Sequence, residues 1–208
     1  MTDTPTRPPA DTVAVSPPPT VAAAAVVPVL HPVPDPRAAF AGTAPSGGDP
    51  PMVAATRAAV RDVENLLDAA PIGHTREAVL ATAVEWGVTA LHDAIAAAGR
   101  RVLSDAEAAR LSVLLIFEGV RDQAWHGCDG SDAQLWLWAD LTRRAAPPLA
   151  AAPARLLAAT AYLRGDGPLA RAAAQRAVQL EPDDRQACGL IAALDAGVPP
   201  HQRHLGRI

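Results

Sequence analysis

Lysine is absent from this chain of 208 residues, so all 18 of its basic side chains are arginines. The acidic residues number 22, which gives a formal net charge of −4 at pH 7. Proteins that bind nucleic acids usually present a basic face to the phosphates. No such face is evident, so the sequence argues against a nucleic-acid partner and keeps a DNA-associated regulator only as a second alternative.

Cysteine is almost as scarce, because only Cys128 and Cys188 occur. A secreted disulfide framework needs more cysteines, and a structural zinc site needs them close together. The apolar run near the start, Val21 to Leu30, contains Pro28 and is too short to span a membrane. We therefore expect a cytoplasmic protein with no membrane partner.

Aromatic residues make up only 3% of the chain, whereas half of all residues are hydrophobic and many of these are alanines. Alanine has the highest helix propensity, and strands favour β-branched and aromatic residues. The composition predicts an all-α fold in which small side chains let helices pack closely together.

Residues 1–51 contain 13 of the 21 prolines, which block helices and sheet ladders alike. This composition predicts a disordered Pro/Ala-rich tail that acts as a linker, or else docks in an aromatic groove of a partner. The sequence Gly47-Gly48-Asp49-Pro50-Pro51 marks the boundary. Residues 52–208 should then form one helical domain.

In that domain the apolar residues recur with a helical period, and we expect a compact bundle of about six or seven helices. Thr75 is the predicted cap of a long helix, which has an apolar stripe formed by Leu80, Val84, Val88, Leu91 and Ile95. Ser104 and Glu107 have the spacing of a capping box for the next helix, and Gly119 should bend or break that helix. Ser131 and Gln134 repeat the spacing before a helix that turns Trp138 inward and Trp136 to another face.

Residues 153–182 have the spacing of a degenerate tetratricopeptide (TPR-like) unit, followed by a capping helix over 185–196. Ala170 and Ala177 occupy its small positions and would let two antiparallel helices approach closely. A single unit cannot bury its own apolar face. We therefore expect this hairpin to pack on the preceding helices.

From about Ser104 onward the chain resembles an actinobacterial family called domain of unknown function 4192. The similarity lies in the segments Val120-Arg121-Asp122, Leu135 to Leu141, Ala158 to Gly167, and Ala170 through Leu180 to Pro182. Members of the family also carry an N-terminal α/β half, which nothing in residues 1–103 resembles. The resemblance implies that this chain keeps the helical portion, and it brings no known activity or functional residues.

The best candidates for acid–base chemistry are Glu118, Asp122 and His126, spaced four residues apart on one expected helix. Two carboxylates and an imidazole on one face could hold a divalent metal or transfer a proton. The alternative is an ion-paired or solvated face, with Arg121 pairing with a neighbouring acid. No phosphate-binding loop, nucleophile elbow or dinucleotide fingerprint is present, so we assign no catalytic residue, cofactor or metal.

Tryptophans offer a different kind of site. Trp125, Trp136 and Trp138 are candidate anchors for a protein partner, or else ordinary core residues. The sequence favours a non-enzymatic protein–protein interaction or scaffold module. The alternative from another class is a small metal-assisted hydrolase that uses Glu118, Asp122 and His126.

Overall fold

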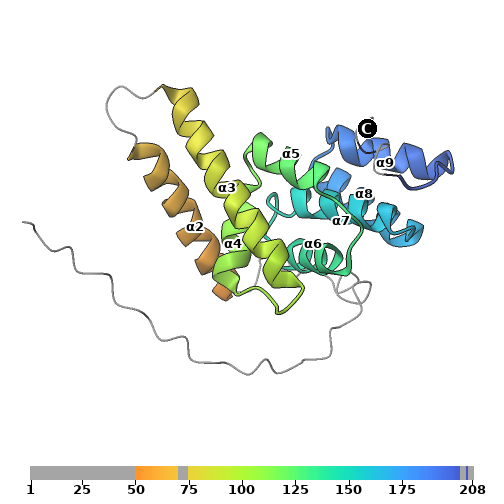
Figure 1. Ribbon diagram of the computed structural model, residues 1–208, viewed down its shortest axis with the longest axis horizontal. Helices are drawn as coiled ribbons and strands as arrows, with labels where there is room; N and C mark the ends of the chain where they lie inside the picture. Colours follow the sequence, from red (N-terminus) through yellow and green to blue (C-terminus); the bar gives the residue numbers. More distant parts are fainter. Residues whose placement is uncertain (1–49, 70–74, 202–204, 206–208) are drawn as a thin grey trace, which may run out of the picture. The chain divides into compact units, whose positions relative to one another are not determined.

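The computed structural model describes residues 50–69, 75–201 and 205. These residues form eight α-helices and no strand (Figure 1), which confirms the all-α prediction. The predicted tail, up to residue 49, lies outside the described residues. Pro50 and Pro51, which we assigned to the tail, instead open the first described helix, where proline is well tolerated because its missing N–H would have no partner.

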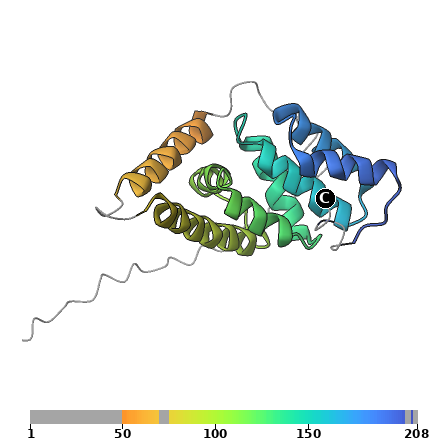
Figure 2. The ribbon, with the colours of Figure 1, turned by 90° about the horizontal axis from the view of Figure 1, so that it is seen from above.

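The first four described helices are α2 (Pro50–Asp68), α3 (Arg76–Ala98), α4 (Asp105–Leu114) and α5 (Glu118–His126). They are followed by α6 (Asp132–Arg144), α7 (Ala151–Leu163), α8 (Gly167–Leu180) and α9 (Arg185–Asp195). Helix α4 packs against α2, α3 and α6, and α7 packs against α5, α6, α8 and α9. Figures 1 and 2 show α8 and α9 beside α7.

Side-chain caps set the predicted helix starts. The Thr75 hydroxyl accepts a hydrogen bond from the N–H of Ala78 at 3.2 Å. At α4 the capping box is complete, because the Ser104 hydroxyl accepts from the N–H of Glu107 and the Glu107 carboxylate accepts from the N–H of Ser104. At α6 the Ser131 hydroxyl accepts from the N–H of Gln134 at 3.4 Å, but the Gln134 side chain does not complete a second box.

The carboxylate of Glu107 also accepts two hydrogen bonds from the Arg101 guanidinium, at 2.8 and 2.6 Å. The Arg101 hydrogen bonds, with further help from Ser104, lower the pKa of Glu107 to about 2. This ion pair closes the turn between α3 and α4 at the protein surface.

The break after α4 lies one turn earlier than we expected. Helix α4 ends at Leu114, residues 115–117 form a turn, and α5 starts at Glu118. Gly119 therefore lies inside the first turn of α5 and does not interrupt a helix. Its role is steric: a Cβ at this position would lie 2.9 Å from Cγ1 of Val84 on α3.

Helix α3 is buried along a different line from the predicted stripe. Its buried residues are mostly small: Ala83, Gly87, Leu91, Ala94 and Ala97. Of the predicted stripe only Leu91 is fully buried, and Leu80 is 38% exposed. The small side chains let α5 approach α3 closely, so the larger side chains of the stripe lie at the edges of this contact.

The expected hairpin of residues 153–182 is formed by α7 and α8, which are joined by a short turn at Gly165 (φ +81°). Every side chain of α7 from Ala151 to Tyr162 is buried, so this helix is the centre of the C-terminal half. Ala154, Ala177 and Ala187 bring α7, α8 and α9 together through small side chains. The predicted packing of this hairpin on earlier helices is confirmed by its contacts with α5 and α6.

A buried ion pair links α7 to the start of α9. Arg155 Nη1 donates to Asp184 Oδ2 at 2.9 Å, and the two side chains are 8% and 1% exposed. The second carboxylate oxygen of Asp184 accepts from the N–H of Ala187 and caps α9. One carboxylate thus holds both the arginine and the helix end in place.

Candidate interaction pocket

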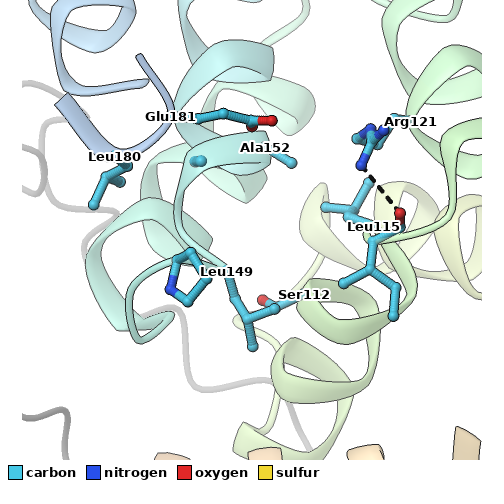
Figure 3. Close-up of a pocket in the computed structure, with 10 residues that line it drawn as sticks. Ser112, Leu115, Arg121, Leu149, Ala152, Leu180 and Glu181 are labelled. Carbon is cyan, nitrogen blue, oxygen red and sulfur yellow. Dashed lines mark hydrogen bonds between the residues drawn. The ribbon is translucent and has the colours of Figure 1, made fainter. Parts of the chain in front are cut away.

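A pocket of about 310 Å³ lies between the α4–α5 turn on one side and the ends of α7 and α8 on the other (Figure 3). This volume is at the lower end of the range for ligand sites. Its walls are mainly aliphatic and come from Leu115, Ile116, Leu149 and Leu180. We call this site the interhelical pocket.

Two charged side chains lie at one end of the interhelical pocket. In Figure 3 the carboxylate of Glu181 points toward the side of the pocket that carries Arg121. Arg121 Nη1 donates to the carbonyl oxygen of Ile116 at 3.0 Å. Within the described part of the chain, neither Arg121 nor Glu181 forms an ion pair. Both retain hydrogen-bonding capacity for a ligand.

The local fold explains why Arg121 is held there. Phe117 and Glu118 open α5, which places Arg121 one turn into the helix, close to the turn of residues 115–117 that follows α4. Its guanidinium satisfies the carbonyl group of Ile116, a residue of that turn. Ser112 also lines the pocket. Its hydroxyl donates to the carbonyl oxygen of Ala108, so this proton is not available to a ligand.

The α5 candidates lie on one helix, as their spacing predicted, but the structure does not assemble them into a compact site. Glu118, Asp122 and His126 are all exposed. His126 Nδ1 lies 2.8 Å from the backbone oxygen of Asp122, not from its carboxylate. Among residues 50–69, 75–201 and 205, no three His, Cys, Asp or Glu side chains are placed to share a metal ion.

Two of the three candidate tryptophans are core residues. Trp125 is 2% exposed and donates its indole N–H to the carbonyl oxygen of Leu205 at 3.1 Å, so it ties the C-terminal segment to α5. Trp138 is 0% exposed, as its predicted inward direction requires. Neither side chain offers a surface to a partner in this conformation.

The other tryptophans are partly exposed. Trp136 is half-buried on another face of α6, as predicted from its spacing to Trp138. Trp86 of α3 is also half-buried, and the guanidinium carbon of Arg110 lies 4.1 Å from the centre of its ring. This cation–π contact ties α3 to α4 and covers part of the indole.

The two cysteines differ in environment. Cys128 is buried, and burial is the main reason why the pKa of its thiol is raised to about 12. Cys188 on α9 is free and exposed. Cys128 is thus a packing residue, and the accessible thiol lies on a different helix.

All regular secondary structure in the described part of the chain is helical. The family model of the domain of unknown function DUF4192 matches residues 8–201. The chain therefore belongs to the DUF4192 family. The match extends well beyond the portion from Ser104 onward that we predicted, so our inference that only the second half of the chain resembles the family was too narrow.

A search of curated proteins and a search of solved structures found no match. None of the described helices is both long and apolar enough to cross a membrane.

The residues of the interhelical pocket were missed by the sequence analysis, apart from Arg121, to which we gave another role. They come from three separate segments, around residues 112–121, 148–152 and 180–181. A hint was available, because Ile116 is an aliphatic residue at a helix break, but only the packing of α7 and α8 shows what faces it.

Proposed function

We propose that this protein is a non-enzymatic helical module that binds a short segment of another protein in the interhelical pocket. The observation that carries the proposal is an aliphatic pocket with one guanidinium and one carboxylate, neither of them ion-paired within the described residues, at the same end. Such a pocket suits an extended segment that inserts an aliphatic side chain and carries charges beside it.

The exposure of Ile116 supports this use of the pocket. Its side chain is 49% exposed although it is aliphatic and lines the pocket wall. A partner that covered Ile116 would remove apolar surface from water, at about 25 cal/mol per Å². Binding would also supply acceptors for Arg121, whose fork of N–H donors suits a carboxylate.

The metal-assisted hydrolase is less well supported. Its three candidate residues are exposed on the surface of α5, and none of them lines the interhelical pocket. A hydrolytic site should bring its acid, its base and its substrate pocket together. We also propose a cytoplasmic location, because a chain with only two cysteines lacks the disulfide framework that is typical of small secreted domains.

The test compares two substitutions of exposed aliphatic residues in loops. Ile116→Arg places a charge in the pocket, and Val102→Arg places the same charge at a position that is 71% exposed and does not line the pocket. Tagged wild-type and variant chains are crosslinked in a lysate of the native cells, and the captured proteins are quantified by mass spectrometry.

We expect at least one protein that wild type and Val102→Arg capture equally and that Ile116→Arg captures about tenfold less. The reason is that burying an unpaired charge in the complex should cost over 1.4 kcal/mol of binding free energy. Circular dichroism checks that both variants are folded. Capture that is equal for all three chains would refute the pocket as the binding surface.

A further inference from the structure

The two charged groups of the interhelical pocket differ in burial. The side chain of Arg121 is half-buried, and the carbonyl group of Ile116 uses only one of its five N–H donors. Glu181 is exposed, and it faces Arg121 from the other side of the pocket (Figure 3). A charge that is partly removed from water attracts a partner more strongly than a fully solvated charge. The strongest contact that this pocket offers is therefore to an anion at Arg121.

The start of α7 adds positive charge to the pocket. Four of the lining residues lie at or just before this helix start, namely Pro148, Leu149, Ala151 and Ala152. The N-cap residue of α7 is Ala150, whose methyl group cannot accept a hydrogen bond from the first N–H groups of the helix. The N-terminus of a helix carries a partial positive charge. The guanidinium and the helix start together favour a carboxylate in the pocket.

The remainder of the pocket suits an aliphatic side chain. Leu115 and Leu149 lie below the two charged side chains in Figure 3, and both line the pocket. With a volume of about 310 Å³, the pocket is small for a ligand site. A chain end needs only to enter such a pocket, whereas an internal segment must also leave it. A carboxylate next to an aliphatic side chain is the chemistry of the last residue of a protein.

We propose that the interhelical pocket binds the C-terminus of a partner protein whose last residue is leucine, isoleucine or valine. This inference rests on the proposed function and names the kind of segment that is bound. The terminal carboxylate accepts hydrogen bonds from Arg121, whose fork of donors matches its two oxygen atoms. The aliphatic side chain lies between Leu115 and Leu149, and Ile116 is covered by the bound segment.

Glu181 favours a basic residue two positions before the end of the partner. Alternate side chains of an extended segment point to the same side, so this residue faces the pocket as the last residue does. A lysine or arginine at that position is long enough to reach Glu181 at the rim. Helix α8 ends at Leu180, and the partial negative charge of its C-terminus favours the same cation. The preferred partner thus ends in a basic residue, any residue and an aliphatic residue.

The experiment measures the binding of labelled peptides to the full chain by fluorescence anisotropy. The probe is Gly-Ser-Gly-Ser-Gly-Arg-Ser-Leu, with fluorescein at its N-terminus and a free carboxylate at its C-terminus. One matched control has the same residues and a C-terminal amide. A second control carries two further glycines after the leucine, which moves the carboxylate away from the aliphatic side chain. Unlabelled N-acetylleucine is added as a competitor, to test whether a small carboxylic acid is sufficient.

We expect the free acid to bind about tenfold more tightly than the amide or the extended peptide, which corresponds to about 1.4 kcal/mol. Arg121→Gln should remove this preference, and Val102→Arg, outside the pocket, should retain it. Glu181→Arg should weaken binding of the free acid about threefold, as is typical of an exposed ion pair. A peptide with glutamate in place of its arginine should recover that loss in Glu181→Arg. Circular dichroism checks that the variants are folded.

Four results would overturn the proposal. One is the absence of binding by the free acid, and another is equal affinity of the free acid, the amide and the extended peptide. The third is a preference for the free acid that survives Arg121→Gln, which would place the site elsewhere. The fourth is N-acetylleucine that binds as tightly as the peptide, which would assign the pocket to a small carboxylic acid. If the peptides fail but Ile116→Arg still loses its captured protein, the proposed function stands and only this inference fails.

Discussion

Gly87 lies where α3 packs closely against α5, and its replacement by alanine tests how tightly the fold is packed. A Cβ at position 87 would lie 2.4 Å from Cγ2 of Val120 on α5. Non-bonded carbon atoms prefer a separation of about 3.5 Å or more, so the overlap is about 1 Å. Val120 is completely buried and branched at Cβ, so it has few rotamers to which it can move.

Two opposing effects decide the result of Gly87→Ala. Alanine should stabilise the interior of α3 by about 1 kcal/mol, because glycine is a poor helix former. Overpacking a well-packed contact usually costs about 1–3 kcal/mol, and an overlap of about 1 Å against a stiff side chain belongs at or above the upper end of that range. We expect the steric effect to win, with a net loss of about 2 kcal/mol of unfolding free energy.

The assay is urea unfolding followed by circular dichroism. With a denaturant slope of about 2 kcal/mol per M, the midpoint should fall by about 1 M. Gly119→Ala should cost less, because its Cβ would meet the partly buried Val84 at 2.9 Å. Gly99→Ala is the control, since its Cβ would make an ordinary contact of 3.6 Å with Ala133.

A double-mutant cycle identifies the cause of the loss. Val120→Ala removes the methyl group that the new Cβ would strike, so Gly87→Ala should be neutral or stabilising in that background. If Gly87→Ala raised the stability of the wild-type background by about 1 kcal/mol, helix propensity would have won and the close crossing of α3 and α5 would be refuted.

Three further predictions concern ionisable groups. Asp184→Ala should destabilise the fold by about 3–5 kcal/mol in urea unfolding, because it leaves Arg155 buried without its carboxylate and uncaps α9; a loss under 1 kcal/mol would contradict this. Iodoacetamide at pH 8 should modify Cys188 and spare Cys128 in intact-mass spectra, since burial raises the pKa of Cys128 to about 12; double modification of the native protein would be inconsistent with that burial. The pKa of Glu107 is lowered to about 2, so its contribution to stability is full above the ordinary carboxyl pKa and disappears as the pH falls through 2. Because Glu107 is 42% exposed, Glu107→Gln should lower the free energy of unfolding by only about 0.2–1 kcal/mol at pH 7. This difference from wild type should vanish at acid pH. A difference that does not depend on pH would mean that the charge of Glu107 is not its cause.

Local chemistry made the helix starts and the fold class predictable. Ser104 and Glu107 satisfy each other's backbone N–H groups over four residues, so no distant part of the chain is needed to form that cap. The same is true of Thr75 and Ser131. The inward direction of Trp138 followed from helical periodicity, and the family was found from the order of short segments, though its extent was underestimated.

Non-local packing decided what the sequence could not. Which residues of α3 are buried depends on which helix packs against it. Val120 of α5 packs against Gly87, so Gly87 and the small residues near it are buried in place of the predicted stripe of larger side chains. Residues distant in sequence also meet where periodicity gives no sign of it, as Arg155 does with Asp184.

By itself, the sequence determined an all-α chain with defined helix starts, because caps and propensities act over a few residues. Only the tertiary structure decided that Arg121 faces an aliphatic pocket together with Glu181 and does not pair with an acid on its own helix. The physical reason is that Glu181 and the aliphatic residues 148–152 come from distant segments of the chain, so only the packing of α7 and α8 brings them to the pocket that Arg121 lines.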